Sequence, residues 1–142
     1  MARDARAELA DRLHSAAIHL LRRVRRTDRR TGVPAAQLSA LSVLMHGPRT
    51  VGELAAAEQV RPPTMTRLVQ ELERAGLARR EPDAKDRRVV RIRSTPKGER
   101  VLARGRELRI AELERRLARL SPRERADLTR GVEIVERLVR DE

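Results

Sequence analysis

The sequence contains no cysteine and no aromatic residue among its 142 residues. The lack of cysteine excludes disulfides, thiol redox sensing and thiolate metal sites. Because single-stranded nucleic acids and RNA loops are usually bound by stacking on aromatic rings, the lack of aromatics argues against partners of those two kinds. Asp4, Glu8 and Asp11 introduce charges that a signal peptide would not carry, and no apolar run approaches the roughly 20 residues of a membrane span. The sequence therefore predicts a cytoplasmic protein.

Positive charge, in contrast, is abundant. The chain has 33 basic and 21 acidic residues, a formal charge of +12 and a pI of about 11.6. Only Lys85 and Lys97 are lysines, so nearly all of the basic charge is arginine, which binds phosphate in a bidentate manner. A genome biased towards arginine codons would also raise the arginine content, so the sign of the charge is more informative than the residue type. It predicts a polyanionic partner, either nucleic acid or an anionic membrane surface.

Residues 61–76 carry the clearest helical pattern. A helix here places four apolar residues in one stripe: Met65, Leu68, Val69 and Leu72. Pro63 suits a first helical position, and Gly76 suits the left-handed residue just past a helix end. The opposite face offers hydroxyls, guanidinium groups and an amide, on Thr64, Thr66, Arg67, Gln70 and Arg74. Such a face fits a DNA major groove, although a solvated helix surface is the simpler alternative when this helix is considered alone.

The residues before this helix predict a helix-turn-helix. Thr50 and Glu53 match a capping box, in which the threonine hydroxyl caps the glutamate amide and the glutamate reaches back. The box begins a short helix over residues 51–58, and residues 59–61 form the turn into the helix described above. Two short helices joined by a tight turn are typical of a helix-turn-helix.

The residues after this helix predict a β-hairpin. Residues 77–81 and 89–93 read as strands, and the basic, turn-forming segment 82–88 lies between them. Seven basic and three acidic residues lie between Arg79 and Arg93. A hairpin directly after a helix-turn-helix is a wing, and two adjacent basic elements favour DNA binding over a merely solvated hairpin.

The two ends of the chain predict long amphipathic helices. We expect helices over residues 4–30, from Pro34 to the Gly47-Pro48 stop, from Pro96 to about 120, and from a second capping box at Ser121 to the end. The apolar residues of the terminal helices exceed what one small domain can cover: Leu113, Leu117, Leu128, Val135 and Leu138. The same helices of a second copy would cover them, which predicts a homodimer. Because this use occupies the apolar faces, membrane-surface binding is disfavoured.

The order of these parts resembles the MarR (multiple-antibiotic-resistance-regulator) family of bacterial repressors. The resemblance spans nearly the whole chain and is strongest from Pro34 to Gly98, in the stretches PAAQLSALSVLMHGPRTVGELA, TMTRLVQELERAGLARR and DAKDRRVVRIRSTPKG. It implies that Asp86 holds Arg88, which enters the minor groove at the wing tip. It further implies a homodimer built from the terminal helices, a near-palindromic operator, and, as in many members, release of DNA when a small, often anionic or phenolic ligand binds between the dimer and DNA-binding regions.

Three features depart from the family pattern. Arg61 occupies the position where relatives often have a Ser, Thr or Asp that caps the recognition helix. Ser94 replaces the usual leucine at the end of the second wing strand. The aromatic rings that often line the family's ligand pocket are absent.

Taken with the resemblance, the sequence predicts a mainly α (α+β) fold, a winged helix-turn-helix whose terminal helices form a dimerisation region. Residues 1–31 and 96–142 would form that helical dimerisation region, and residues 32–95 the DNA-binding region. The expected major-groove residues are Pro63, Thr64, Thr66, Arg67, Gln70 and Arg74. The expected wing residues are Lys85, Asp86, Arg87, Arg88 and Arg91.

The predicted function is sequence-specific binding of double-stranded DNA by a transcriptional regulator, a homodimeric repressor relieved by a small-molecule effector. The alternative is a non-specific architectural DNA-binding protein that uses the same charge. An enzyme is disfavoured because no nucleophile, ligand-spaced cluster or phosphate-binding glycine loop accompanies His14, His19 and His46. No catalytic residue, cofactor or metal site is therefore predicted. Any effector is expected to be a small anion attracted by arginines near the junction of the first and last helices.

Overall fold

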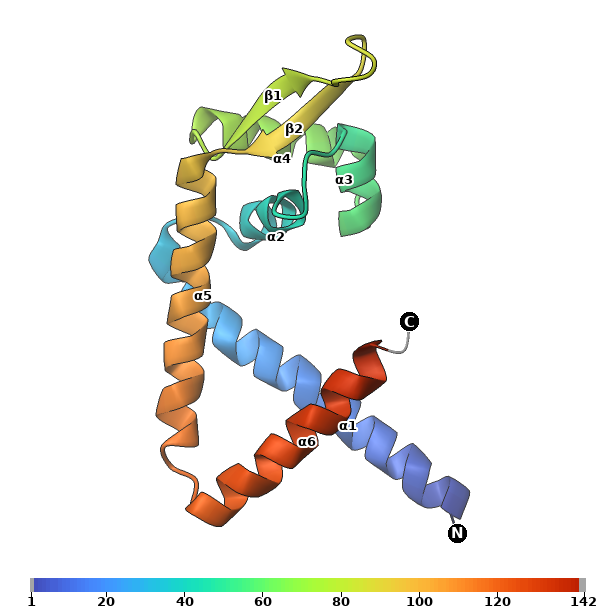
Figure 1. The fold of residues 1–142 in the computed structure, drawn as a ribbon, viewed down its shortest axis with the longest axis vertical. Coiled ribbons are helices and arrows are strands. Elements are labelled where there is room, and N and C mark those ends of the chain that lie inside the picture. The colour runs from blue at the N-terminus through green and yellow to red at the C-terminus, as the bar shows by residue number, and fades with distance from the viewer. Residues whose placement is uncertain (1, 141–142) are drawn as a thin grey trace. The chain divides into compact units, whose positions relative to one another are not determined.

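The computed structural model describes residues 2–140, and its elements are shown in Figure 1. Their order is α1 (Ala2–Arg25), a 3-10 helix η1 (Arg26–Thr31), α2 (Ala35–Leu44), α3 (Val51–Glu58), α4 (Pro62–Arg74), β1 (Ala78–Pro82), β2 (Val90–Ser94), α5 (Pro96–Leu117) and α6 (Pro122–Arg140). The chain divides into two compact units, one up to Arg109 and one from Ile110 onward. No helix among the described residues is long and apolar enough to cross a membrane. The mainly α fold with one small sheet is as predicted.

The core of the first unit lies between α2, α3, α4 and the sheet. Its largest fully buried side chains come from all of these elements: Leu41, Leu54, Met65, Val69, Leu72, Leu77 and Ile92. The four residues of the predicted α4 stripe are all buried, so that stripe is confirmed. Burying it leaves the opposite face of α4 free at the surface.

The predicted helix-turn-helix is formed by α3 and α4. Thr50 Oγ1 accepts from the Glu53 amide at 3.1 Å and Glu53 Oε2 accepts from the Thr50 amide at 2.9 Å, which confirms the capping box. Gln59 adopts a left-handed conformation with φ of 55°, which turns the chain towards α4. The first helical residue of α4 is Pro62 rather than the predicted Pro63, and Arg61 makes no side-chain cap.

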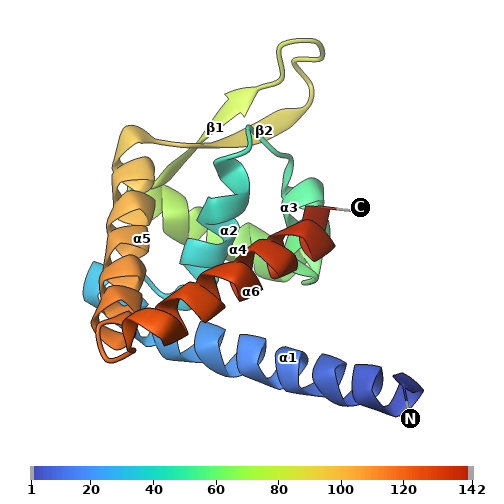
Figure 2. The same cartoon turned by 60° about the horizontal axis from the view of Figure 1, so that its bottom comes forward.

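The two strands form the predicted antiparallel hairpin, with Arg80 opposite Ile92 and Glu81 opposite Arg91. In both views it projects away from α2, α3 and α4, with its loop at the free end (Figures 1 and 2). Both strands begin one residue later than predicted. Leu77 instead closes the end of α4, since its amide donates to the Leu72 carbonyl at 2.8 Å, and the Val89 amide closes the wing turn by donating to the Asp86 carbonyl at 2.9 Å.

The first helix differs from the prediction at its C-terminal end. It is α-helical only to Arg25, and the segment to Thr31 is a 3-10 helix. The hydroxyls of Thr27 and Thr31 donate to carbonyls three residues earlier, a pairing that matches the tighter 3-10 turn. The turn carries the buried Asp28 carboxylate to Arg109, whose Nη1 donates to Asp28 Oδ1 at 2.6 Å. This contact with a residue distant in sequence explains why the segment departs from the α-helix that its local pattern predicts.

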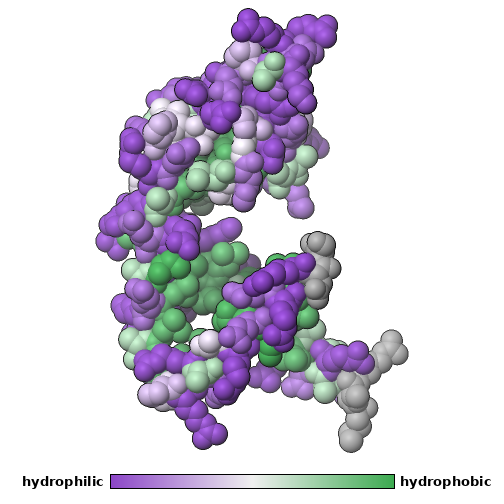
Figure 3. Space-filling model, in the orientation of Figure 1, coloured by the Kyte–Doolittle hydropathy of each residue, from purple (hydrophilic) through white to green (hydrophobic). Residues whose placement is uncertain are grey.

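The second unit contains the end of α5 and all of α6. The α5 helix ends at Leu117, three residues before the predicted end, and Ser121 and Glu124 form the second capping box that the sequence predicts. No residue of α6 is buried, and hydrophobic side chains are visible among the polar ones along it (Figure 3). Several large apolar residues of this unit are exposed: Leu117, Leu128, Val132, Ile134, Val135, Leu138 and Val139.

Candidate nucleic-acid interface

The exposed face of α4 presents most of the predicted major-groove residues. Four of the six are polar and exposed: Thr64, Arg67, Gln70 and Arg74. Pro63 is also exposed, and Thr66 is half-buried. The Thr66 hydroxyl donates to the Pro62 carbonyl at 3.0 Å, so its oxygen remains available as an acceptor. This face therefore carries amide, guanidinium and hydroxyl groups of the kind that pair with base edges.

Arg67 is held in place by a carboxylate of its own helix. Its Nη1 donates to Glu71 Oε1 at 2.8 Å, and the arginine side chain remains 64% exposed. The other carboxylate oxygen, Glu71 Oε2, accepts from Gln37 Nε2 of α2 at 2.9 Å. Neither contact is among the predictions made from the sequence. The spacing of four between Arg67 and Glu71 is a signal for the first contact, whereas nothing in the sequence indicates the contact with Gln37.

The tip of the wing contains the predicted pair of Asp86 and Arg88. Asp86 Oδ1 accepts from Arg88 Nε and from the Arg88 amide, and Asp86 Oδ2 accepts from Arg88 Nη2, all at 3.1 Å. The pKa of the Asp86 carboxyl is lowered, mainly by the Arg88 side chain and then by the Arg88 amide. The Arg88 side chain is 90% exposed, so the pair leaves the guanidinium accessible while holding it to Asp86. Lys85 and Arg87, on either side of Asp86, are exposed as well. The wing and its surroundings show as hydrophilic in Figure 3.

Arg91 has a different environment from the other predicted wing residues. Its Nε donates to Asp83 Oδ1, its Nη1 donates to Glu53 Oε2 at 3.2 Å, and its side chain is only 30% exposed. The pKa of the Asp83 carboxyl is lowered to about 2 by Arg91 and then by the amides of Asp86 and Lys85. The structure therefore brings Arg91 together with two carboxylates. From the sequence, Glu53 is expected only in the capping box and Asp83 only as an acidic residue of the wing loop. Neither contact with Arg91 is predicted.

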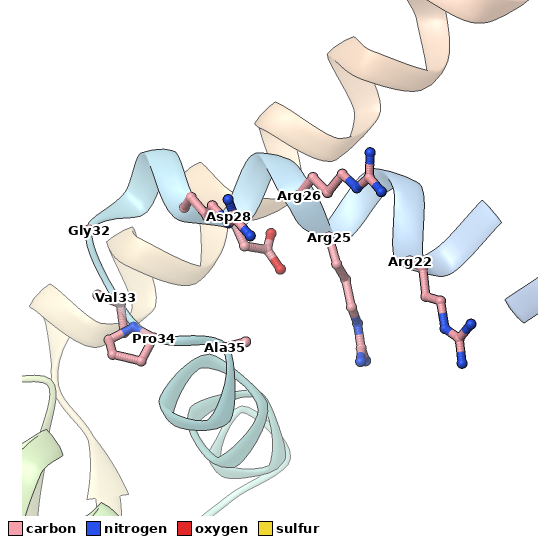
Figure 4. A pocket seen from close by; sticks show the side chains of 9 residues that line it. Arg22, Arg25, Arg26, Asp28, Gly32, Val33, Pro34 and Ala35 are labelled. Carbon is pink, nitrogen blue, oxygen red and sulfur yellow. The ribbon is translucent and has the colours of Figure 1, made fainter. Parts of the chain in front are cut away.

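A cationic cavity of about 560 Å³ lies at the end of α1. Its lining consists of Arg22, Arg25, Arg26, Asp28, Arg29, Gly32, Val33, Pro34 and Ala35. Arg22 and Arg25 extend in the same direction, on the side where α2 begins, whereas Arg26 points the other way (Figure 4). Among residues 2–140, no ion pair is formed by any of the four arginines, and Asp28 is already paired with Arg109. The cavity is thus suited to a small anion.

The described part of the chain, residues 2–140, contains no group of three or more histidines, cysteines or acidic residues that could hold a metal ion. The candidate binding surfaces are the polar face of α4, the wing and the cationic cavity.

Comparisons with known proteins agree with this arrangement. The family model described as "MarR family" matches residues 31–89, which contain α2, α3, α4 and the wing loop. An uncharacterized HTH-type transcriptional regulator of Mycobacterium leprae is 34% identical over 137 residues, covering 96% of both chains. The solved structure of a MarR family protein from Bacillus stearothermophilus is 32% identical, with a TM-score of 0.77 and coverage of 98% of both chains.

A more distant structure is similar in fold. It is that of a mutant MepR protein from S. aureus, bound to an oligodeoxyribonucleotide, with 18% identity, a TM-score of 0.70 and coverage of 93% of this chain and 98% of that one. Near-complete coverage by relatives above 30% identity, together with the family match over the helix-turn-helix and wing loop, identifies this chain. It belongs to the MarR family of DNA-binding transcriptional regulators.

Proposed function

We propose that this protein is a cytoplasmic, homodimeric repressor that binds a near-palindromic duplex operator. The observation that carries the proposal is the pairing of Arg67 with Glu71 and of Arg88 with Asp86. A protein that only attracts phosphates gains nothing from neutralising its own arginines. A protein that reads sequence and shape does gain, because an arginine held in place loses less side-chain freedom when it binds.

In this proposal, α4 lies in the major groove and the wing in the adjacent minor groove. Arg67 and Gln70 would contact base edges, while Pro63, Thr64, Thr66 and Arg74 would complete the contact surface of the helix. Arg88 would enter the minor groove, where the negative potential is strongest at narrow A·T segments, and Lys85 and Arg87 would contact phosphates. The DNA-bound MepR mutant, which shares the fold, supports an interface of this kind.

The proposed dimer uses residues 1–31 and 96–142. Leu128, Val135 and Leu138 of α6 are 43%, 38% and 63% exposed, and such apolar exposure is unfavourable in a monomer. A second copy of the same helices would cover them and place two recognition helices on one operator. Sedimentation at micromolar concentration tests this proposal, and a folded monomer there would contradict both the dimer and the palindrome.

The proposed effector is a small anion bound in the cationic cavity at the end of α1. Arg22 and Arg25 would bind its negative groups. The test compares operator release by benzoate and by chloride at equal ionic strength. Benzoate should release more operator from the wild type and from the control Arg23→Ala, whose side chain does not line the cavity. The double variant Arg22→Ala/Arg25→Ala should respond equally to both salts, and an unaltered benzoate response in it would contradict this site.

Selection of bound duplexes from a random pool tests the function as a whole. A repressor should enrich a near-palindromic sequence, and adding small-molecule anions to the enriched complex then tests relief. Enrichment of no sequence would contradict the proposal and favour the architectural alternative, in which the basic surface binds any duplex.

A further inference from the structure

Arg91 connects the wing to the helix-turn-helix. Its Nη1 donates to Glu53 Oε2 in the first turn of α3 at 3.2 Å, and its Nε donates to Asp83 Oδ1 in the wing loop. We propose that Arg91 is a positioning residue for DNA binding, which fixes the wing loop to α3 through Glu53 and Asp83 and does not itself contact DNA. This proposal rests on the proposed function and gives Arg91 a different role from the wing contact that the sequence predicts.

Both carboxylates that Arg91 joins are themselves anchored to backbone amides. Glu53 Oε2 also accepts from the Thr50 amide at 2.9 Å, as part of the capping box of α3. Asp83 Oδ2 accepts from the amides of Lys85 at 2.9 Å and Asp86 at 3.0 Å. The guanidinium therefore links two fixed points rather than two mobile side chains, which is the condition for an ion pair to hold a loop in place.

The contact reaches the exposed arginine at the wing tip through a short series of bonds. Asp83 holds the amide of Asp86, and the Asp86 carboxylate holds Arg88. Displacing Asp83 would thus alter the direction in which Arg88 points. A second link already fixes the middle of β2, because Arg49 and Ile92 exchange two backbone hydrogen bonds of 3.0 and 2.7 Å. That link holds the strand but not the wing loop. A separate contact is therefore needed to hold the loop, and the bond from Arg91 to Asp83 provides it.

Charge and exposure both argue against a phosphate contact for Arg91. One positive group faces two negative ones, so the cluster has no net attraction for DNA. The Arg91 side chain is 30% exposed, whereas the Arg88 side chain is 90% exposed. A phosphate would have to displace a carboxylate from Arg91 but could reach Arg88 directly.

Salt dependence separates positioning from contact. Arg91→Met should weaken operator binding by about 3- to 10-fold, the cost of leaving the wing less ordered before binding, with no change in the slope of log affinity against log salt. The comparison variant Arg88→Met should lower that slope by about 0.9, the value for one phosphate charge neutralised on duplex DNA, because the minor-groove position brings the guanidinium close to the backbone charges. An equal fall in slope for Arg91→Met would overturn the proposal.

Two matched charge variants separate wing positioning from simple charge, because the two explanations predict opposite changes in DNA affinity. Glu53→Gln preserves the capping box, because glutamine also serves at that position, but removes the charge that Arg91 contacts. Loss of a negative charge alone should tighten DNA binding, whereas loss of wing positioning should weaken it. Glu58→Gln, on the same helix and without an ion pair among residues 2–140, makes the same charge change and should bind equally well or slightly more tightly. Identical behaviour of the two variants would overturn the proposal.

Titration of the Asp83 carboxyl by NMR tests the pairing without DNA. Its midpoint should lie near the pKa of about 2 in the wild type and move towards the ordinary 3.8 in Arg91→Met. A midpoint that is the same in both proteins would overturn the inference. A wild type that binds every duplex equally would instead contradict the proposed function, and this titration would still decide whether Arg91 holds the wing loop.

Discussion

Three arginines of α4 and the wing differ from the arginines at the end of α1 in whether a carboxylate holds them. Arg67, Arg88 and Arg91 each donate to at least one carboxylate, from Glu71, Asp86, or Asp83 and Glu53. Arg22, Arg25, Arg26 and Arg29 line a cavity of about 560 Å³, and within residues 2–140 they form no ion pair. One chain thus has both held and free arginines.

The difference shows how an excess of one residue type can have two uses. A carboxylate partner reduces the attraction of an arginine for anions in general, but it restricts the side chain to one direction. Weaker general attraction combined with a fixed direction favours recognition of a partner with fixed geometry, such as a DNA groove. Free arginines keep their full attraction and their mobility, which suits a small anion that approaches from solution.

The largest effect should come from removing a held arginine on α4. Arg67→Ala should reduce discrimination between operator and altered operator by about 1–3 kcal/mol, because a bidentate base contact is lost. Arg22→Ala removes the same charge from the end of α1 and should leave base preference unchanged. Titrations of both variants against operator and a scrambled duplex measure this. Equal weakening of all duplexes by Arg67→Ala would make α4 a phosphate clamp and favour the architectural function.

The next effect concerns the carboxylate at the wing tip. Asp86→Ala removes a negative charge from the wing loop, which we propose faces DNA, so charge alone predicts tighter binding. If Asp86 holds Arg88 in place, operator binding should instead weaken by about 2- to 10-fold, because Arg88 loses more freedom on binding.

Glu58→Ala on α3 is a suitable control for this variant, as it removes the same charge without a paired arginine. Titrations of each variant against the operator at two salt concentrations show whether binding becomes tighter or weaker. Tighter binding of Asp86→Ala at both concentrations would leave the wing as a plain basic patch.

A smaller effect is expected from the contact behind Arg67. Gln37→Ala removes the amide that donates to Glu71 Oε2 and leaves the pair of Glu71 and Arg67 intact. Operator affinity should fall about 2-fold, near the low end of the range for one hydrogen bond. Ser42→Ala, also on α2, removes a hydroxyl that donates only to the Ser39 carbonyl and should have no effect. A larger loss for Gln37→Ala than for Arg67→Ala would show that Gln37 acts other than through Glu71.

No effect is expected from mild hydroperoxide on the complex with operator. The chain has no cysteine, so a thiol switch cannot release DNA. Met65 is fully buried, and oxidation of the exposed Met45 would be damage rather than a reversible signal. Fluorescence anisotropy of a labelled operator during hydroperoxide addition measures this. Rapid release that a thiol reductant reverses would contradict the prediction.

Features that depend on short stretches of the chain could be predicted from the sequence. The α4 stripe, both capping boxes and the left-handed Gly76 follow from spacings of a few residues, and each is present. The pair of Asp86 and Arg88 is of the same kind, because two residues on one tight loop have few other ways to meet. The fold class followed from the order of these local elements and from the family resemblance.

Features that depend on distant pairing were decided only by the tertiary structure. The 3-10 end of the first helix serves the contact between Asp28 and Arg109, which are 81 residues apart. The sequence predicts a DNA contact for Arg91 but not its two carboxylate partners, because a basic residue in a wing strand looks the same whether its side chain faces solvent or a neighbouring helix. Its partner Glu53 lies 38 residues earlier, and only packing of the hairpin beside α3 brings the two together. Periodicity assigns a residue to a face, but the element opposite that face depends on how the whole chain packs.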